Sequence, residues 1–236
     1  MTAAETGLTR FRAPMKETLV SEWKVAMQGA SERGLGRREM FLRSAALFGA
    51  GTLLTSALHA QSPPTDVSLL NYALTLENLE AAFYTQGLAQ FSSADFGNST
   101  FIQNFGSVIG GDVYAYLSLI RDHETQHVRT LQSLITGLGG TPAVPCTYNF
   151  GYKTADSFVT VAALIENTGV MAYDGALNQI QSASLKTAAA TIATVEARHA
   201  SYLNLLTGTS PFPASFDTAA TSVAILAAVA QYITAC

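Results

Sequence analysis

Residues 124–127 read Glu-Thr-Gln-His and residues 196–199 read Glu-Ala-Arg-His, so one Glu-x-x-His pattern occurs twice in the chain. Around each copy, apolar residues recur at helical spacing, which predicts an α-helix. Positions i and i+3 share one face of a helix, so each copy presents a carboxylate and an imidazole to the same point. If the two helices face each other, the four side chains meet.

Two single glutamates complete a twofold repeat. Glu77 is followed seven residues later by Tyr84, and Glu166 is followed seven residues later by Tyr173. The order along the chain is therefore Glu, Glu-x-x-His, Glu, Glu-x-x-His. Six ligands from four helices suit two ions of the Fe or Mn type. The expected metal ligands are Glu77, Glu124, His127, Glu166, Glu196 and His199.

Four more residues lie close to this pattern in the sequence. Glu80 is an alternative ligand, although the matching Glu-x6-Tyr pattern in the other helix favours Glu77. Tyr84 and Tyr173 either hydrogen-bond the ligating carboxylates or belong to the aromatic core. His123 immediately precedes the first Glu-x-x-His and points about 100° away from that glutamate on a helix. We therefore interpret it as a surface residue or a neighbour of the ligands.

The apolar periodicity predicts an all-α protein, with four long helices and an apolar fifth helix at the C-terminus. The expected ranges are 66–90, 112–136, 156–182 (with Asp156 as its N-cap), 184–206 and 215–234. The third and fourth helices are joined by a very short turn and form an antiparallel hairpin. Residues 137–155 are long enough to run the length of a bundle, as a crossover between the second and third helices requires. A short helix is also expected over 101–108.

The N-terminal sixty residues have the order of an export signal. Residues 36–43 read Gly-Arg-Arg-Glu-Met-Phe-Leu-Arg, and a weakly apolar run follows over 44–58. That run is shorter than the ~20 residues of a membrane span, and the arginine pair resembles a twin-arginine signal. A retained membrane anchor and a general secretory signal are the alternatives. We expect 1–60 to be the leader and 61–236 to be exported, to the periplasm or outside the cell, with no membrane span after cleavage.

The two cysteines, Cys146 and Cys236, both belong to the part expected to be exported. Their spacing fits no zinc pattern. In an oxidising compartment, such an even pair favours a disulfide that ties the end of the chain to the central loop. Two free buried thiols are the alternative.

The charge distribution limits the partners. Residues 1–60 have eight Lys or Arg and five Asp or Glu, whereas 61–236 have five and twelve, a net charge of −7. Such an acidic body lacks the basic surface that phosphate binding needs, so no nucleic-acid partner is expected. The final helix has no ionisable side chain between Asp217 and Tyr232, which makes it a packing element or the surface of a homo-oligomer.

The alternating Glu and Glu-x-x-His pattern resembles the ferritin-like superfamily of di-metal carboxylate proteins. The run Leu-Glu-Asn-Leu-Glu-Ala-Ala-Phe-Tyr at 76–84 and the loop Pro-Cys-Thr-Tyr-Asn-Phe at 145–150 look like its exported, desiccation-related branch. The resemblance implies a ferritin-like crossover bundle and the same six ligands, none of which is replaced here. It also implies an oxidoreductase that reacts with O2 or peroxide, or oxidises ferrous iron, in stress protection. A non-catalytic metal-binding or structural protective protein is the alternative.

Overall fold

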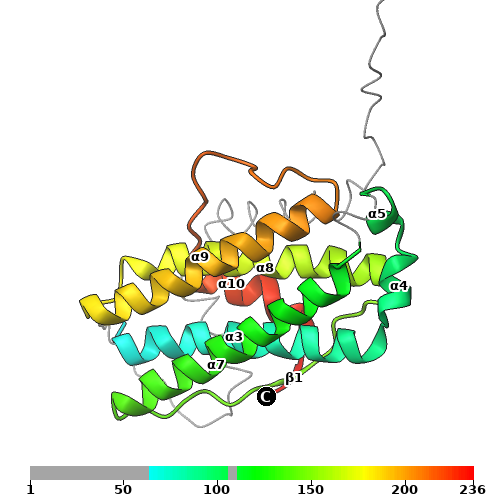
Figure 1. The fold of residues 1–236 in the computed structure, drawn as a ribbon. Coiled ribbons are helices and arrows are strands. Elements are labelled where there is room, and N and C mark those ends of the chain that lie inside the picture. Colours follow the sequence, from blue (N-terminus) through cyan, green and yellow to red (C-terminus); the bar gives the residue numbers. More distant parts are fainter. Residues whose placement is uncertain (1–63, 106–110) are drawn as a thin grey trace, which may run out of the picture.

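The computed structural model of the protein describes residues 64–105 and 111–236, and four long helices form the bundle in this part (Figure 1). The helices are α3 (Asp66–Gln90), α7 (Val113–Gly137), α8 (Ala155–Leu177) and α9 (Ala183–Leu206). α3 packs chiefly on α7, and α8 packs chiefly on α9. The all-α bundle expected from the sequence is therefore confirmed. The expected leader, 1–60, lies outside the described residues.

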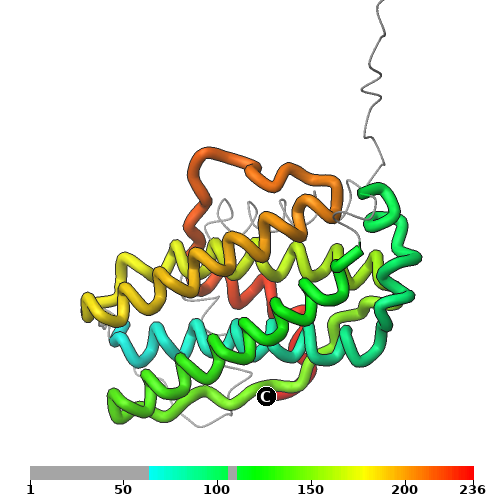
Figure 2. Tube along the Cα trace, viewed as in Figure 1, coloured from blue at the N-terminus to red at the C-terminus, as the bar shows by residue number. Residues whose placement is uncertain are grey.

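The segment between α7 and α8 runs along the length of the bundle, as the crossover topology requires (Figure 2). It contains the short strand β1 (Thr147–Tyr148), which pairs antiparallel with β2 (Ile233–Ala235) at the end of the chain. Next to this pair, Cys146 and Cys236 form a disulfide bond. The C-terminus is thus attached to the crossover both by backbone pairing and by a covalent bond.

Short elements cover the ends and one side of the bundle. α4 (Ser93–Gly97) and α5 (Thr100–Gln103) lie between α3 and α7, while α10 (Ser222–Val229) and the 3-10 turn η1 (Ala230–Tyr232) follow α9. α10 packs on α8 and buries Ile225 and Val229. Val223 and Leu226 on the same helix are each 40% exposed, so α10 is only partly a packing element.

The start of α8 differs from the expectation, because its N-cap is Thr154 and not Asp156. The Thr154 hydroxyl accepts a hydrogen bond from the backbone N–H of Ser157, and the two residues form a capping box. Asp156 lies within the first turn instead. Its carboxylate accepts hydrogen bonds from the hydroxyls of Ser99 and Thr100, which attaches the α4–α5 region to α8.

Two other expected helices were also too long. α8 ends at Leu177 rather than 182, since the backbone N–H groups of 181 and 182 donate to the Asp66 carboxylate at 2.7 and 2.9 Å. The last helix covers 222–229 rather than 215–234, because the final residues form β2 instead. The short helix expected at 101–108 is α5, and residues 106–110 lie outside the described part.

A polar layer separates two apolar clusters in the core. On α7, Val113, Leu117 and Ile120 belong to one cluster, whereas Leu131 and Ile135 belong to the other. The first Glu-x-x-His lies between them, and the second one occupies the same place on α9, between 185–192 and 203–206. The apolar clusters therefore hold the four helices together above and below the site. Within the described residues, no helix combines the length and apolar character needed to cross a bilayer.

Candidate metal centre

The six expected ligands meet in this polar layer. Their oxygen and nitrogen atoms form two groups, and within each group the atoms all lie within 4.8 Å of one another. One group is Glu77, Glu124, His127 and Glu196, and the other is Glu124, Glu166, Glu196 and His199. Glu124 and Glu196 belong to both groups. The arrangement therefore offers two adjacent places for a cation, with two carboxylates shared between them.

Both histidines turn Nδ1 toward the carboxylates. His127 Nδ1 lies 3.0 Å from Glu124 Oε2 and 3.2 Å from Glu77 Oε2. His199 Nδ1 lies 2.9 Å from Glu124 Oε1 and 3.2 Å from Glu166 Oε2. Each Glu-x-x-His thus directs its nitrogen and oxygen to the same point, as i and i+3 positions on a helix allow.

The carboxylates are buried without enough protein partners. Glu77, Glu124, Glu166 and Glu196 are all 0% exposed. Glu124 Oε1 and both oxygens of Glu196 accept no hydrogen bond, although His127 Nδ1 is 3.1 Å from Glu196 Oε1 in a direction unsuited to one. Buried carboxylates without partners are costly, and cation coordination removes that cost. A nitrogen and oxygen ligand set of this kind fits Fe or Mn.

Burial and mutual contacts shift the pKa values of these carboxylates. Burial raises the pKa of Glu77 to about 8, and it raises the pKa of Glu196 well above its ordinary value, with the charge of Glu124 adding to the effect. Burial also opposes ionisation of Glu124, but the hydrogen bond from His127 and the close approach of His199 Nδ1 outweigh it and lower the pKa of Glu124 to about 2. A divalent cation that binds here must displace protons from the ligands.

Glu77 and Glu166, which each belong to only one ligand group, accept hydrogen bonds from tyrosines on the opposite helix. The Tyr84 hydroxyl on α3 donates a 2.6 Å hydrogen bond to Glu166 Oε1 on α8. The Tyr173 hydroxyl on α8 donates a hydrogen bond to Glu77 Oε1 on α3. Both tyrosines therefore hydrogen-bond the expected ligands, and both are also buried in the aromatic and aliphatic core.

The comparison with known families agrees with this geometry. Residues 65–209 match the model of a family described as a ferritin-like domain. The chain belongs to the ferritin-like family. It is also similar to Protein rds1 of Schizosaccharomyces pombe, with 25% identity over 171 residues. That match covers 72% of this chain but only 40% of the length of the yeast protein.

Glu80 is a fifth carboxylate beside the ferritin-like centre. It is 2% exposed but belongs to neither of the two ligand groups, so the geometry favours Glu77 as the α3 ligand. Burial raises the pKa of Glu80 well above its ordinary value, and the charge of Glu196 adds to the effect. Gly169 on α8 makes room for this pair. A Cβ there would lie 2.9 Å from Glu80 Oε1 and 3.2 Å from Glu196 Oε2.

The main residue that sequence analysis placed incompletely is His123. Its Nδ1 lies 3.0 Å from Nε2 of His199, across the gap between α7 and α9. The position of His123 relative to its neighbour Glu124 does not predict this contact. The informative spacing is to His127, because positions i and i+4 share one helix face. That spacing was visible in the sequence.

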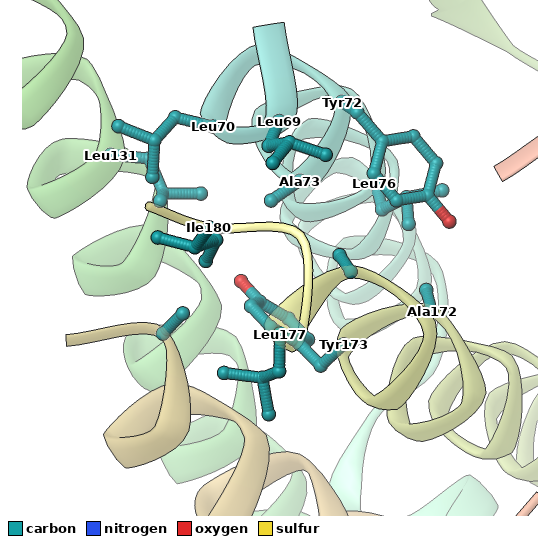
Figure 3. Close-up of a pocket in the computed structure, with 12 residues that line it drawn as sticks. Leu69, Leu70, Tyr72, Ala73, Leu76, Leu131, Ala172, Tyr173, Leu177 and Ile180 are labelled. Carbon is teal, nitrogen blue, oxygen red and sulfur yellow. The ribbon is translucent and has the colours of Figure 1, made fainter. Parts of the chain in front are cut away.

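A small pocket lies beside Tyr173, the residue whose hydroxyl bonds Glu77 (Figure 3). Its volume is about 20 Å³, and Tyr173 lines it together with apolar side chains such as Leu69, Ala73 and Leu76. None of the six expected ligands lines this pocket. The pocket is far below the ~300 Å³ of a site for a drug-sized molecule, so it excludes an organic substrate of that size.

Proposed function

We propose that this ferritin-like protein holds two Fe or Mn ions and acts as a di-metal oxidoreductase. Its reactants would be O2, peroxide or ferrous iron, and its role would be stress protection. The observation that carries the proposal is the pair Glu124 and Glu196, which belong to both ligand groups and have buried oxygens without hydrogen bonds. Two cations between shared carboxylates would satisfy those oxygens.

The side chains around such a centre would have separate tasks. Glu77, Glu124, His127, Glu166, Glu196 and His199 would hold the ions. When bound, Fe or Mn supplies one-electron redox chemistry that these side chains lack. Tyr84 and Tyr173 keep the carboxylates of Glu166 and Glu77 in place through their hydrogen bonds. The apolar clusters on either side exclude water, which strengthens every electrostatic interaction inside.

The burial of the centre supports a small reactant. All four ligating glutamates are fully buried, and the two histidines are only 9% and 5% exposed. A centre enclosed in this way favours reactants of only a few atoms. O2 and peroxide meet this limit.

Export of the protein is a further part of the proposal. The Cys146–Cys236 disulfide is typical of oxidising compartments, which the periplasm and the cell exterior are. The arginine pair in 36–43 and the apolar run in 44–58 favour the twin-arginine route. That route carries folded proteins, so the metal centre would be loaded in the cytoplasm before export. N-terminal sequencing of the exported protein tests this, and a start near residue 61 is the expected result.

A second function is a metal-binding or structural protective protein without turnover. The observation that favours it is the complete burial of the carboxylates, since no ligand atom of Glu124 or Glu196 faces solvent. In that case the ions would mainly stabilise the bundle, as any ligand that binds only the folded state does.

One set of assays separates the two functions. The metal-loaded protein and its Glu124→Ala variant are compared for O2 and peroxide consumption and for ferrous iron oxidation. We expect consumption by the unmodified protein and its loss in the variant. If the unmodified protein consumes none of the three reactants while chelation lowers its thermal stability, the oxidoreductase is contradicted and the non-catalytic function stands.

A further inference from the structure

The two nitrogens of His199 face different partners. Nδ1 points into the centre, 2.9 Å from Glu124 Oε1 and 3.2 Å from Glu166 Oε2. Nε2 points outward and lies 3.0 Å from Nδ1 of His123, with the two rings only 11° from parallel. The contact links an exposed residue of α7 to a buried residue of α9.

This contact determines where the protons lie when a cation is bound. A neutral imidazole that ligates through Nδ1 keeps its proton on Nε2 and can only donate from there. His123 must then accept at Nδ1 and carry its own proton on Nε2. A hydrogen bond donated by the outer N–H of a ligating histidine fixes the tautomer and ring orientation of that histidine and increases its basicity as a ligand.

The other half of the centre has no such contact. In the twofold repeat, His123 precedes Glu124 in the same way that Val195 precedes Glu196. Valine has no acceptor atom. Among the side-chain hydrogen bonds of residues 64–105 and 111–236, none involves Nε2 of His127. The two places for a cation therefore differ in a contact outside the ligands: within the described residues, Nε2 of His199 has a hydrogen-bond partner and Nε2 of His127 has none.

We propose that His123 is a positioning residue that orients His199 and makes the cation place of Glu166 and His199 the tighter of the two. The proposal rests on the di-metal centre proposed above. It means that the centre fills in order: the His199 half takes the first ion, and the His127 half takes the second.

The test is a titration of the metal-free full-length protein with Co²⁺, followed by calorimetry and by visible absorption. Co²⁺ is chosen because its visible absorption reports the coordination geometry at each binding step, and the half that is filled is identified by its sensitivity to the His123 variants. Three variants are compared with the unmodified protein. His123→Leu removes the acceptor, and His123→Asn keeps one, since the amide oxygen of Asn lies close to the place of Nδ1. Val195→Leu is the matched control at the equivalent position of the repeat.

We expect two unequal binding steps in the unmodified protein. His123→Leu should weaken the tighter step by about 10- to 100-fold and change its absorption, while the total remains two ions per chain. His123→Asn should restore most of the affinity, and Val195→Leu should change neither step. Restoration by Asn is a result that a purely structural role for the His123 ring would not produce.

Several results would overturn the proposal. These are an unchanged tighter step in His123→Leu, an equal loss in both steps, or no recovery in His123→Asn. If the unmodified protein bound no Co²⁺, the di-metal centre would fail together with this inference. If it bound two ions that were insensitive to His123→Leu, only the inference would fail. Circular dichroism of the metal-free variants establishes that each one is folded.

Discussion

The hydroxyl of Tyr84 on α3 donates a 2.6 Å hydrogen bond to Oε1 of Glu166 on α8. The reverse pairing joins Tyr173 on α8 to Glu77 on α3. Each of these helices thus supplies one carboxylate to the centre and the tyrosine that holds the carboxylate of the other. The repeat in the sequence has a direct counterpart in space, because each Glu-x6-Tyr helix supports its partner.

Removing one of these hydrogen bonds should weaken metal binding. In Tyr84→Phe, the ring still fills its place in the core, but Glu166 loses its donor. Since such supporting bonds orient the ligands, we expect the affinity for Mn²⁺ to fall by about tenfold. Calorimetric titration measures this. Tyr114→Phe is the control, because its hydroxyl bonds only the backbone oxygen of Leu88; equal affinities in all three proteins would contradict the role of Tyr84.

The stability of the metal-free protein should decrease as the pH rises. Despite burial, hydrogen bonds and charges from the carboxylates raise the pKa of His127 to about 12 and that of His199 to about 10, above the ordinary value of 6.5. The folded state therefore binds more protons than the unfolded chain above pH 6.5, and this stabilisation is lost as the pH approaches those values. Burial of Glu77, with a pKa of about 8 against 4.5, acts in the same direction between those two values.

Urea denaturation at several pH values measures this dependence. For the metal-free protein, we expect the midpoint to fall steadily between about pH 6.5 and about pH 9. For the metal-loaded protein the fall should be smaller, since its ligands have already lost these protons. A midpoint that rises with pH in the metal-free protein would show that the histidines are not held protonated by the carboxylates.

Gly169→Ala should disturb the centre more than the fold. The new Cβ would approach Glu80 Oε1 to 2.9 Å and Glu196 Oε2 to 3.2 Å, so at least one carboxylate must move. Because Glu196 belongs to both ligand groups, we expect weaker binding of both ions, by about tenfold. The control is Gly137→Ala at the end of α7, where no atom lies within 4 Å of the added carbon. Equal metal affinities in the two variants would refute the close approach.

The disulfide should contribute to stability but not to metal binding. Cys146 and Cys236 close a loop over 90 residues, and neither belongs to a ligand group. The chain-entropy model assigns such a loop about 4.6 kcal/mol of unfolding free energy. We expect Cys236→Ser to lose about that amount, and Cys146→Ser to lose the same, with the double variant losing no more. A variant that loses its metal as well would show that the crossover also shapes the centre.

The bundle and the convergence of its expected ligands could be predicted from the sequence. Glu124, His127, Glu196 and His199 can form one metal centre only if their helices place them in the same layer. The connection between the helices could also be predicted, because the segment 137–155 is long enough to form the crossover between the two halves of the repeat. Spacing within a single helix was sufficient for these conclusions. The ferritin-like family match over residues 65–209 agrees with them.

Contacts between distant segments could not be predicted in the same way. The end of α8 depends on Asp66, which lies 115 residues before Gln181 and binds its backbone N–H. The bond between His123 and His199 depends on how α7 and α9 are rotated relative to each other. The last helix ends at Val229 because the residues beyond it form β2, in which Ala235 pairs with Thr147 of β1, 88 residues earlier. Each of these is a tertiary interaction that local propensity does not contain.

Elemental analysis of the protein isolated from the cell that produces it determines whether the chain holds a di-metal centre. We expect about two Fe or Mn ions per chain, and a loss of both in Glu124→Ala, because this carboxylate belongs to both ligand groups. Unmodified protein without Fe or Mn, or a Glu124→Ala variant that keeps two ions, would contradict this expectation.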